Sequence, residues 1–170
     1  MWKNLLFIFL FLSMPLFAKE ANSPINTVSS FLESMKSKNY STASTFILKA
    51  ELKWLKQSTL PLLKNKEFIE SYGIPSLDNN EISSLTDADI FELWSYIALE
   101  IRDKSFGSYA PENVLGSIRE NDILAHVVVK DIINPEHEAL VYTVNLEENT
   151  WKIKLPRIIK GTVTISNRVF

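Results

Sequence analysis

The spacing of apolar residues changes near residue 110, and this change constrains the fold more than any other feature of the sequence. Before that point the apolar residues recur with the 3.6-residue period of helices; after it they follow the pattern of β-strands. Helices first and strands afterwards are typical of an α+β domain, in which helices pack on one face of an antiparallel sheet. We therefore expect N-terminal helices packed on a sheet formed mainly by the C-terminal third.

Three amphipathic helices are expected in the first part of the chain. They cover residues 26–39, 41–57 and 85–103, and the expected N-caps are Asn26, Ser41 and Thr86. The first two form a helical hairpin, and the third is apolar around most of its surface, which is typical of a helix that is buried on more than one side. Between them, Pro61, Gly73 and Pro75 interrupt the pattern, so residues 58–84 are expected to form a short helix and irregular chain.

The last third is typical of an antiparallel meander. Strands are expected at residues 121–133, 138–147 and 150–156, with a fourth at 161–166. Asn134-Pro135 marks the first turn and Glu148-Asn149 the second.

The first eighteen residues have the pattern of a secretory signal peptide, with Lys3, an apolar run over residues 5–12, Pro15 and then Ala18. A membrane-spanning helix needs about 20 apolar residues, and Pro15 interrupts the run well before that length. We expect cleavage near Ala18, a single mature α+β domain over residues 19–170, and a periplasmic or secreted location without stable membrane insertion. The absence of cysteine excludes a disulfide-stapled extracellular fold.

Composition argues against several functions. The chain has 18 Lys and Arg against 20 Asp and Glu and shows no basic patch, so nucleic acid is not expected as a partner. With two histidines and no cysteine there is no usual zinc ligand set, and "NPEHE" at 134–138 is typical of a solvated turn. The four glycines form no phosphate-binding loop, and no G-x-S-x-G motif is present. We expect neither a metal nor a cofactor.

Carboxylates offer the only other route to catalysis. Asp87, Asp89 and Glu92 crowd the start of the third helix, where the helix dipole also favours acids. The strand acids, at positions 122, 131, 138 and 147, all lie at strand ends and not in mid-strand, where the base of an isomerase pocket would be expected.

One aromatic wall is a candidate ligand pocket. A two-residue loop at Glu148-Asn149 places Leu146 opposite Trp151, Val144 opposite Ile153 and Tyr142 opposite Leu155. We expect Tyr142, Val144 and Trp151 to share one face of the sheet, with Trp94 of the third helix packed against it. The alternative is that these four residues are ordinary core.

His126 lies in an apolar run, "ILAHVVVKD". If residues 134–137 form the loop, His126 faces Asn145 and shares the opposite face of the sheet with Thr143. This register predicts a partly exposed histidine and not a pocket group; a shift of one residue would turn it inward.

Two segments resemble the nuclear transport factor two-like superfamily, the cone-shaped α+β fold of ketosteroid isomerase and the polyketide cyclases. They are "VSSFLESMKSKNYSTASTFI", with its junction at 38–43, and "LEENTWKIKL", with Trp151-Lys152-Ile153 after the turn. The resemblance implies a curved sheet closed by helices around an apolar pocket. Residues 58–110 have no counterpart in a minimal member of the superfamily.

Three functions are compatible with this reading. The first is an exported binding module that holds a small apolar ligand or a protein partner without catalysis. The second is an isomerase or cyclase acting in the apolar cavity. The third is a purely protein-interacting envelope subunit, which forms a homodimer through the outer face of its sheet, as the resemblance allows. Fold alone does not choose among them.

Overall fold

The structure is a computed structural model that describes residues 22–102, 110–130 and 139–170. The expected signal peptide and the Asn134-Pro135 turn lie outside these ranges. Within them, all helices except α7 precede a four-stranded antiparallel sheet formed by residues 114–153, and α1 packs on it, which confirms the α+β prediction.

The elements follow one another in a simple order. They are α1 (Pro24–Lys36), α2 (Tyr40–Ser44), α3 (Lys49–Thr59), the 3-10 turn η1 (Leu62–Lys64), α4 (Lys66–Tyr72), α5 (Asn79–Ser84), α6 (Asp87–Ser95), the π-helix η2 (Tyr96–Arg102), the 3-10 turn η4 (Pro111–Asn113), β1 (Val114–Asn121), β2 (Leu124–Val129), β3 (Leu140–Glu147), β4 (Thr150–Ile153) and α7 (Arg157–Val169).

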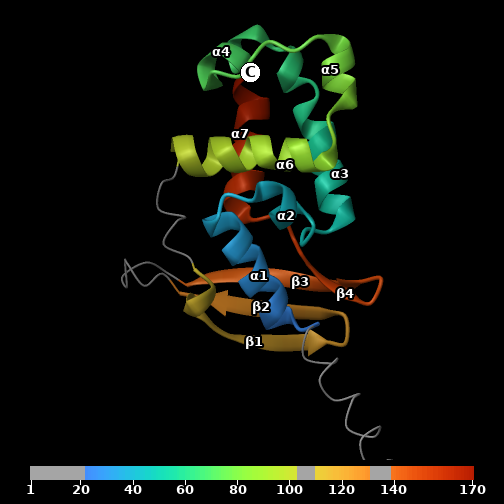
Figure 1. Cartoon of the computed structure of the whole chain (residues 1–170), viewed down its shortest axis with the longest axis vertical. Helices are drawn as coiled ribbons and strands as arrows, with labels where there is room; N and C mark the ends of the chain where they lie inside the picture. The colour runs from blue at the N-terminus through green and yellow to red at the C-terminus, as the bar shows by residue number, and fades with distance from the viewer. Residues whose placement is uncertain (1–21, 103–109, 131–138) are drawn as a thin grey trace, which may run out of the picture.

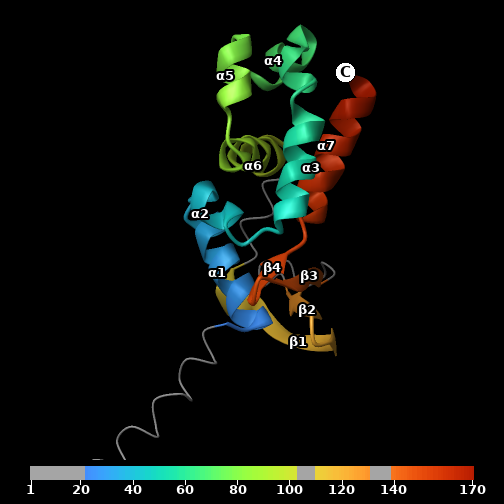
Figure 2. The ribbon, with the colours of Figure 1, turned by 90° about the vertical axis from the view of Figure 1, so that its right-hand side faces the viewer.

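The molecule has two parts, which are stacked along its long axis (Figure 1). At one end α1 lies across the sheet and contacts β1, β2 and β4. At the other end α3, α4, α5, α6 and α7 form what we call the helical body (Figure 2). The buried apolar side chains of both parts belong to one continuous cluster.

Helix α1 follows the predicted pattern but begins earlier. Its buried stripe includes Val28, Phe31 and Leu32, as the i, i+3, i+4 spacing predicts. The N-cap is Ser23 and not Asn26, because Ser23 Oγ accepts from the Asn26 backbone N–H and Pro24 occupies the first helical position.

The predicted second helix is in fact two helices. Asn39 and not Ser41 caps α2, and the chain between α2 and α3 is extended at Ile47, which forms a parallel β-bridge with Ile153. The N–H of Leu48 donates to the Ile153 carbonyl at 3.0 Å, and the N–H of Ile153 donates to the Phe46 carbonyl at 2.7 Å. These long-range hydrogen bonds replace two helical ones, so tertiary pairing overrides the local helical pattern here.

The third predicted helix is present as α6 and η2. Thr86 is its N-cap, and Thr86 and Asp89 form the reciprocal capping box that the sequence indicates. After Ser95 the helix widens into η2, in which Ile97 and Ala98 are fully buried.

Two strand predictions were wrong. Residues 161–166 belong to α7, whose buried residues Ile159, Thr162, Val163 and Ser166 have helical spacing. The first strand of the sheet is β1, which the sequence did not predict. The single strand predicted over residues 121–133 in fact includes the end of β1, the β1–β2 turn and β2. Two register irregularities in β1, after Val114 and after Arg119, break the alternation that would have marked it as a strand.

Candidate functional site

Three of the four predicted pocket residues lie together on the inner face of the sheet. Val144 pairs with Ile153 and Leu146 with Trp151, as predicted, although β4 ends before Leu155. Tyr142, Val144 and Trp151 are all at most 5% exposed. The ring of Phe31 from α1 packs edge-on against Tyr142, with 5.9 Å between centroids. The guanidinium group of Arg119 lies over the Trp151 ring, 5.5 Å from its centroid.

The fourth residue, Trp94, is buried in the helical body and not against this wall. Its indole Nε1 donates to Thr59 Oγ1 in α3 at 2.6 Å. Its ring packs at 5.8 Å from Phe68 in α4, and Phe68 in turn contacts Phe170. All four predicted residues thus belong to the one hydrophobic cluster, but Trp94 lies in the helical body and the other three lie on the sheet.

An open groove does exist, but elsewhere. It has a volume of about 900 Å³ and lies at the tip of the helical body, between α4 and α5. Its apolar lining includes Ile69, Ile74, Leu77 and Ile82, and Lys66 stands at its edge. None of the four predicted pocket residues lines it. Its apolar residues fall in the segment 58–84, whose structure the sequence pattern left undefined.

The second candidate surface is the outer sheet face, the side of the sheet turned away from α1. In β2 and β3 its members alternate with buried residues: Leu124, His126, Val128, Val141, Thr143 and Asn145. In β1, which has no buried residue, the register places Gly116 and Ile118 on this face, with Leu115 the extra residue beside Gly116. Leu115 is 64% exposed, Ile118 68% and Val141 56%, and Ile123 in the β1–β2 turn is 58% exposed. Exposed apolar residues gathered on one surface mark an interaction site more often than scattered ones do.

His126 lies at the centre of this face. It pairs with Thr143 and not with Asn145, so the predicted β2–β3 register was wrong by two residues. A register shift of two residues leaves every side chain on the same face of the sheet. The prediction of a partly exposed, outward-facing histidine is therefore confirmed, with 33% of the side chain accessible. Its Nε2 lies 3.0 Å from Glu120 Oε2, and its Nδ1 lies 3.3 Å from Thr143 Oγ1.

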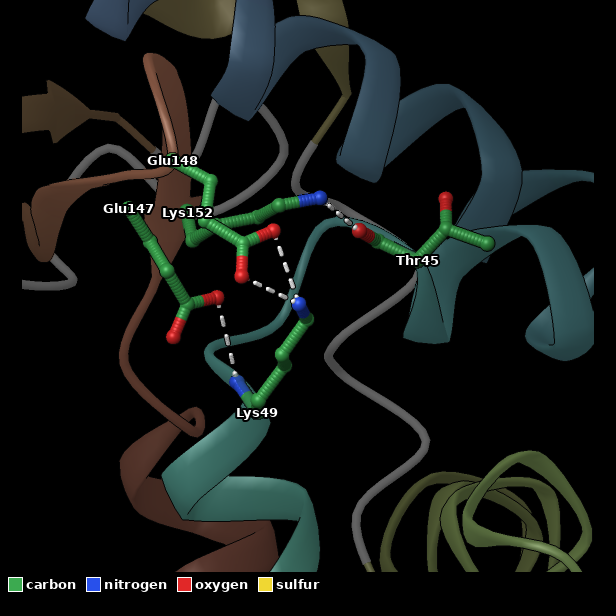
Figure 3. Close-up of polar contacts among 5 residues, drawn as sticks. All are labelled: Thr45, Lys49, Glu147, Glu148 and Lys152. Carbon is green, nitrogen blue, oxygen red and sulfur yellow. Dashed lines mark hydrogen bonds and ion pairs between the residues drawn. The ribbon is translucent and has the colours of Figure 1, made fainter.

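A polar cluster joins the sheet to the helical body (Figure 3). Lys49 Nζ, at the start of α3, donates to both carboxylate oxygens of Glu148 at 2.7 and 2.8 Å. The Lys49 backbone N–H donates to Glu147 at 3.4 Å, and Lys152 Nζ donates to the Thr45 carbonyl at 2.6 Å. Lys49 and Glu148 are exposed and Glu147 and Lys152 are half-buried, so the cluster links the two parts at the surface and offers no enclosed site.

The shifted pKa values also belong to surface groups. The Lys49 ammonium lowers the pKa of Glu148, and the Glu148 carboxylate raises that of Lys49. The Thr86 backbone N–H and hydroxyl lower the pKa of Asp89. A hydrogen bond from its own backbone, with a smaller effect of Lys36, lowers that of Glu112. Each shift stabilises the charged form, which is the opposite of what a buried general acid would need.

Among the residues whose side chains the structure describes, no Asp, Glu, His, Lys or Arg is buried. The buried polar residues there are threonine, serine and asparagine, and the acids at Asp122 and Glu147 are not buried. Asp131 and Glu138 lie outside the described ranges. The described residues also contain no group of three or more His, Asp or Glu placed to hold a metal. No helix among them is long and apolar enough to cross a bilayer.

The sequence pattern missed the β1 residues of the outer sheet face because it did not predict β1, whereas it placed His126, Thr143 and Asn145 on this face correctly. Leu115 and Ile118 flank Gly116, and the irregularity after Val114 puts two residues, Leu115 and Gly116, opposite Val128. No periodic signal distinguished them, because Leu115 and Ile118 are three residues apart, a spacing that fits a helix as well as an irregular strand. Comparison of the chain with protein-family models, with curated proteins and with solved structures found no match.

Proposed function

We propose that this chain is an exported, non-catalytic binding module that holds a protein partner on the outer face of its sheet. The observation that carries the proposal is the exposure of Leu115, Ile118 and Val141 on one side of a sheet whose other side is covered by α1. Full burial of one such side chain is worth about 1.5–3 kcal/mol, so leaving several in water forgoes a substantial stabilisation that a partner would recover.

The size of the face indicates how the partner binds. The face is about three inter-strand spacings wide, at about 4.8 Å each, and about six residues long, at about 3.3 Å each. Its area is therefore roughly 300 Å², whereas a standard interface buries about 800 Å² on each partner. The partner therefore has to contact more than the face itself. β1 is an edge strand of the described sheet, and the regular stretch from Gly116 to Arg119 adjoins the face, so a partner segment paired with this edge would supply further contact.

The relationship to the nuclear transport factor two-like superfamily is part of this proposal. What supports it is that the two segments carrying the resemblance contact each other, through the bridge between Ile47 and Ile153 and the side chain of Lys152 on Thr45. What departs from it is the helical body, which extends away from the sheet and does not close over it (Figure 2).

The test uses photo-crosslinking in the native envelope. A photoreactive residue at position 118 is expected to capture a partner that the same residue at position 53, on the exposed side of α3, does not capture. The purified partner should then bind the wild-type protein, and Ile118→Asp/Val141→Asp should lose at least tenfold in affinity while melting at an unchanged temperature. Equal capture from both positions, or equal affinity of the double variant, would refute the proposal.

The groove at the tip of the helical body favours a second candidate, which is binding of a small apolar molecule. Its volume of about 900 Å³ lies within the range of small-molecule sites, and Ile69, Ile74 and Leu77 give it an apolar lining. An anilinonaphthalene fluorophore should bind the wild-type protein and Ile118→Asp, and Ile74→Asp should abolish its fluorescence enhancement. If both variants bind the dye equally, the groove is not its site.

A further inference from the structure

β1 contains a glycine that the fold itself does not require. The φ angle of Gly116 lies outside the left-handed range, unlike that of Gly73, so another residue could adopt its backbone conformation. A Cβ at Gly116 would meet no atom within 4 Å, so no neighbouring group excludes a larger side chain. Glycine inside a strand lowers stability, and it often marks a bulge or a place where another molecule approaches closely. The irregularity after Val114 does not need a glycine either, since a bulge requires one only where φ is positive.

The missing side chain leaves an open position in the outer sheet face. Gly116 pairs with Val128 and so lies on this face, in the strand that forms the edge of the described sheet (Figure 1). Leu115, 64% exposed, precedes it, and Ile118, 68% exposed, follows on the same face. Val141, 56% exposed, lies beyond Val128 in the same row. Exposed apolar side chains therefore surround a position that nothing in the described part of the chain fills.

The area of this surface favours an extended segment over a second folded copy. The outer sheet face covers roughly 300 Å², which is less than half of what each partner buries in a standard interface. A strand added at the edge also gains main-chain hydrogen bonds, and an aromatic side chain in it buries about 150–250 Å². An aromatic residue opposite an edge glycine stabilises such a position. β1 itself contains no aromatic residue, so the β1 strand of a second copy does not supply one.

The charges at the end of β1 indicate which residue the segment carries there. Glu120 lies on the outer face with its carboxylate beside His126, and Asp122 is exposed in the β1–β2 turn. Neither acid makes an ion pair with a lysine or arginine that the structure describes. Arg119, the cation of β1, lies on the opposite face over Trp151. A basic side chain opposite Glu120 would therefore meet acidic neighbours on its own side of the sheet.

We propose that the β1 edge accepts an extended partner segment with an aromatic side chain over Gly116, an aliphatic one against Ile118 and a basic one beside Glu120. Side chains alternate between the faces of a strand, so these three occupy every second position of the segment. The regular stretch from Gly116 to Arg119 is bracketed by two irregularities, which restrict the added strand to about this length. The inference rests on the proposed function, because it names the kind of partner that the same surface binds.

A labelled peptide of the sequence Thr-Lys-Thr-Val-Thr-Phe-Thr-Val-Thr-Lys-Thr tests the proposal by fluorescence anisotropy. Its sequence reads the same in both directions, so it presents the pattern in either strand orientation. The wild-type protein should bind it at least tenfold more tightly than the same peptide with alanine in place of phenylalanine. Gly116→Val fills the open position and should bind these two peptides equally. Replacing both lysines of the peptide by glutamate should weaken its binding to the wild type at least tenfold.

The matched control is Ser117→Val, because position 117 is exposed on the other face of β1, and it should keep the preference for phenylalanine. Gly116→Val should melt at or above the wild-type temperature, since valine favours strands and its Cβ meets no atom.

Three results would each overturn the inference and leave the proposed function intact. They are failure of the wild type to bind the phenylalanine peptide or to prefer it over the alanine peptide, an undiminished preference in Gly116→Val, and equal binding of the lysine and glutamate peptides. Equal photo-crosslinking from positions 118 and 53 would instead refute the proposed function and this inference with it.

Discussion

The indole of Trp94 and the hydroxyl of Thr59 form a 2.6 Å hydrogen bond in a part of the core where neither side chain is accessible to water. The Thr59 hydroxyl in turn donates to the Leu55 carbonyl at 2.6 Å. This short chain of hydrogen bonds joins α6 to α3 and satisfies the polar end of the largest buried side chain.

Thr59→Val is therefore expected to destabilise the protein by about 1–3 kcal/mol, because it leaves the buried indole N–H without an acceptor. Trp94→Phe should cost a similar amount or more through the cavity it leaves. Since both changes remove the same bond, the double variant should cost less than the sum of the two. Urea unfolding of the four proteins measures this, and strict additivity would show that the bond does not contribute to stability.

Two glycines should respond to alanine in opposite directions. Gly73 ends α4 with φ of +63°, so Gly73→Ala should destabilise by about 1–2 kcal/mol through backbone strain alone. Gly161 lies inside α7, where Gly161→Ala should stabilise by about 0.5–1 kcal/mol. A Cβ at either position meets no atom within 4 Å, so a steric clash contributes to neither change in stability. Thermal unfolding of both variants checks the signs, and two shifts of the same sign would contradict the assigned backbone conformations.

His126→Ala should cost less than about 1 kcal/mol. The imidazole is partly exposed, and its contact with Glu120 is a surface pair of the kind that contributes little. Val127→Ala, at the next and fully buried position, is the matched control and should cost more because it removes buried methyl groups. Chemical denaturation distinguishes the two, and a larger loss at His126 than at Val127 would mean that the register of β2 is wrong.

The capping box of α6 should contribute to acid sensitivity. Because the Thr86 N–H and hydroxyl bind the Asp89 carboxylate, its folded pKa lies below the ordinary value of 3.8. The associated stability is present above that value and is lost as the pH falls through the folded pKa. As the pH falls from about 6 to about 2, Asp89→Asn should therefore lose less stability than the wild type. The midpoints of urea unfolding across this range measure the difference. Asp87→Asn, in the same turn but without a bond to the cap, should follow the wild-type curve.

Local chemistry explains which elements the sequence predicted well. The capping box of α6 lies within four residues, and the hairpin turn needs two residues with positive φ, which Glu148 and Asn149 adopt at 49° and 61°. Such features do not depend on the remainder of the chain. From the turn alone, the pairing of Leu146 with Trp151 follows correctly.

Apart from the N-caps of α1 and α2, the failures involve tertiary structure. The β-branched residues of 161–166 form a helix because Thr162, Val163 and Ser166 are buried where α7 packs on the rest of the helical body. Helical spacing identified the buried side of α6 but carries no information on which element covers it, so Trp94 was placed against the wrong partner. The candidate surfaces share this dependence, since the groove is formed by elements without periodicity and the outer sheet face includes a strand that two irregularities conceal.

The bridge between Ile47 and Ile153 holds together the two chain segments that lead from the sheet into the helical body. α3 begins two residues after Ile47 and α7 begins four residues after Ile153, so both helices leave the sheet from the same place and run side by side. A single covalent connection would act as a swivel, whereas two adjacent connections held by hydrogen bonds resist torsion. We therefore expect the sheet and the helical body to resist twisting against each other more than they would about a single connection.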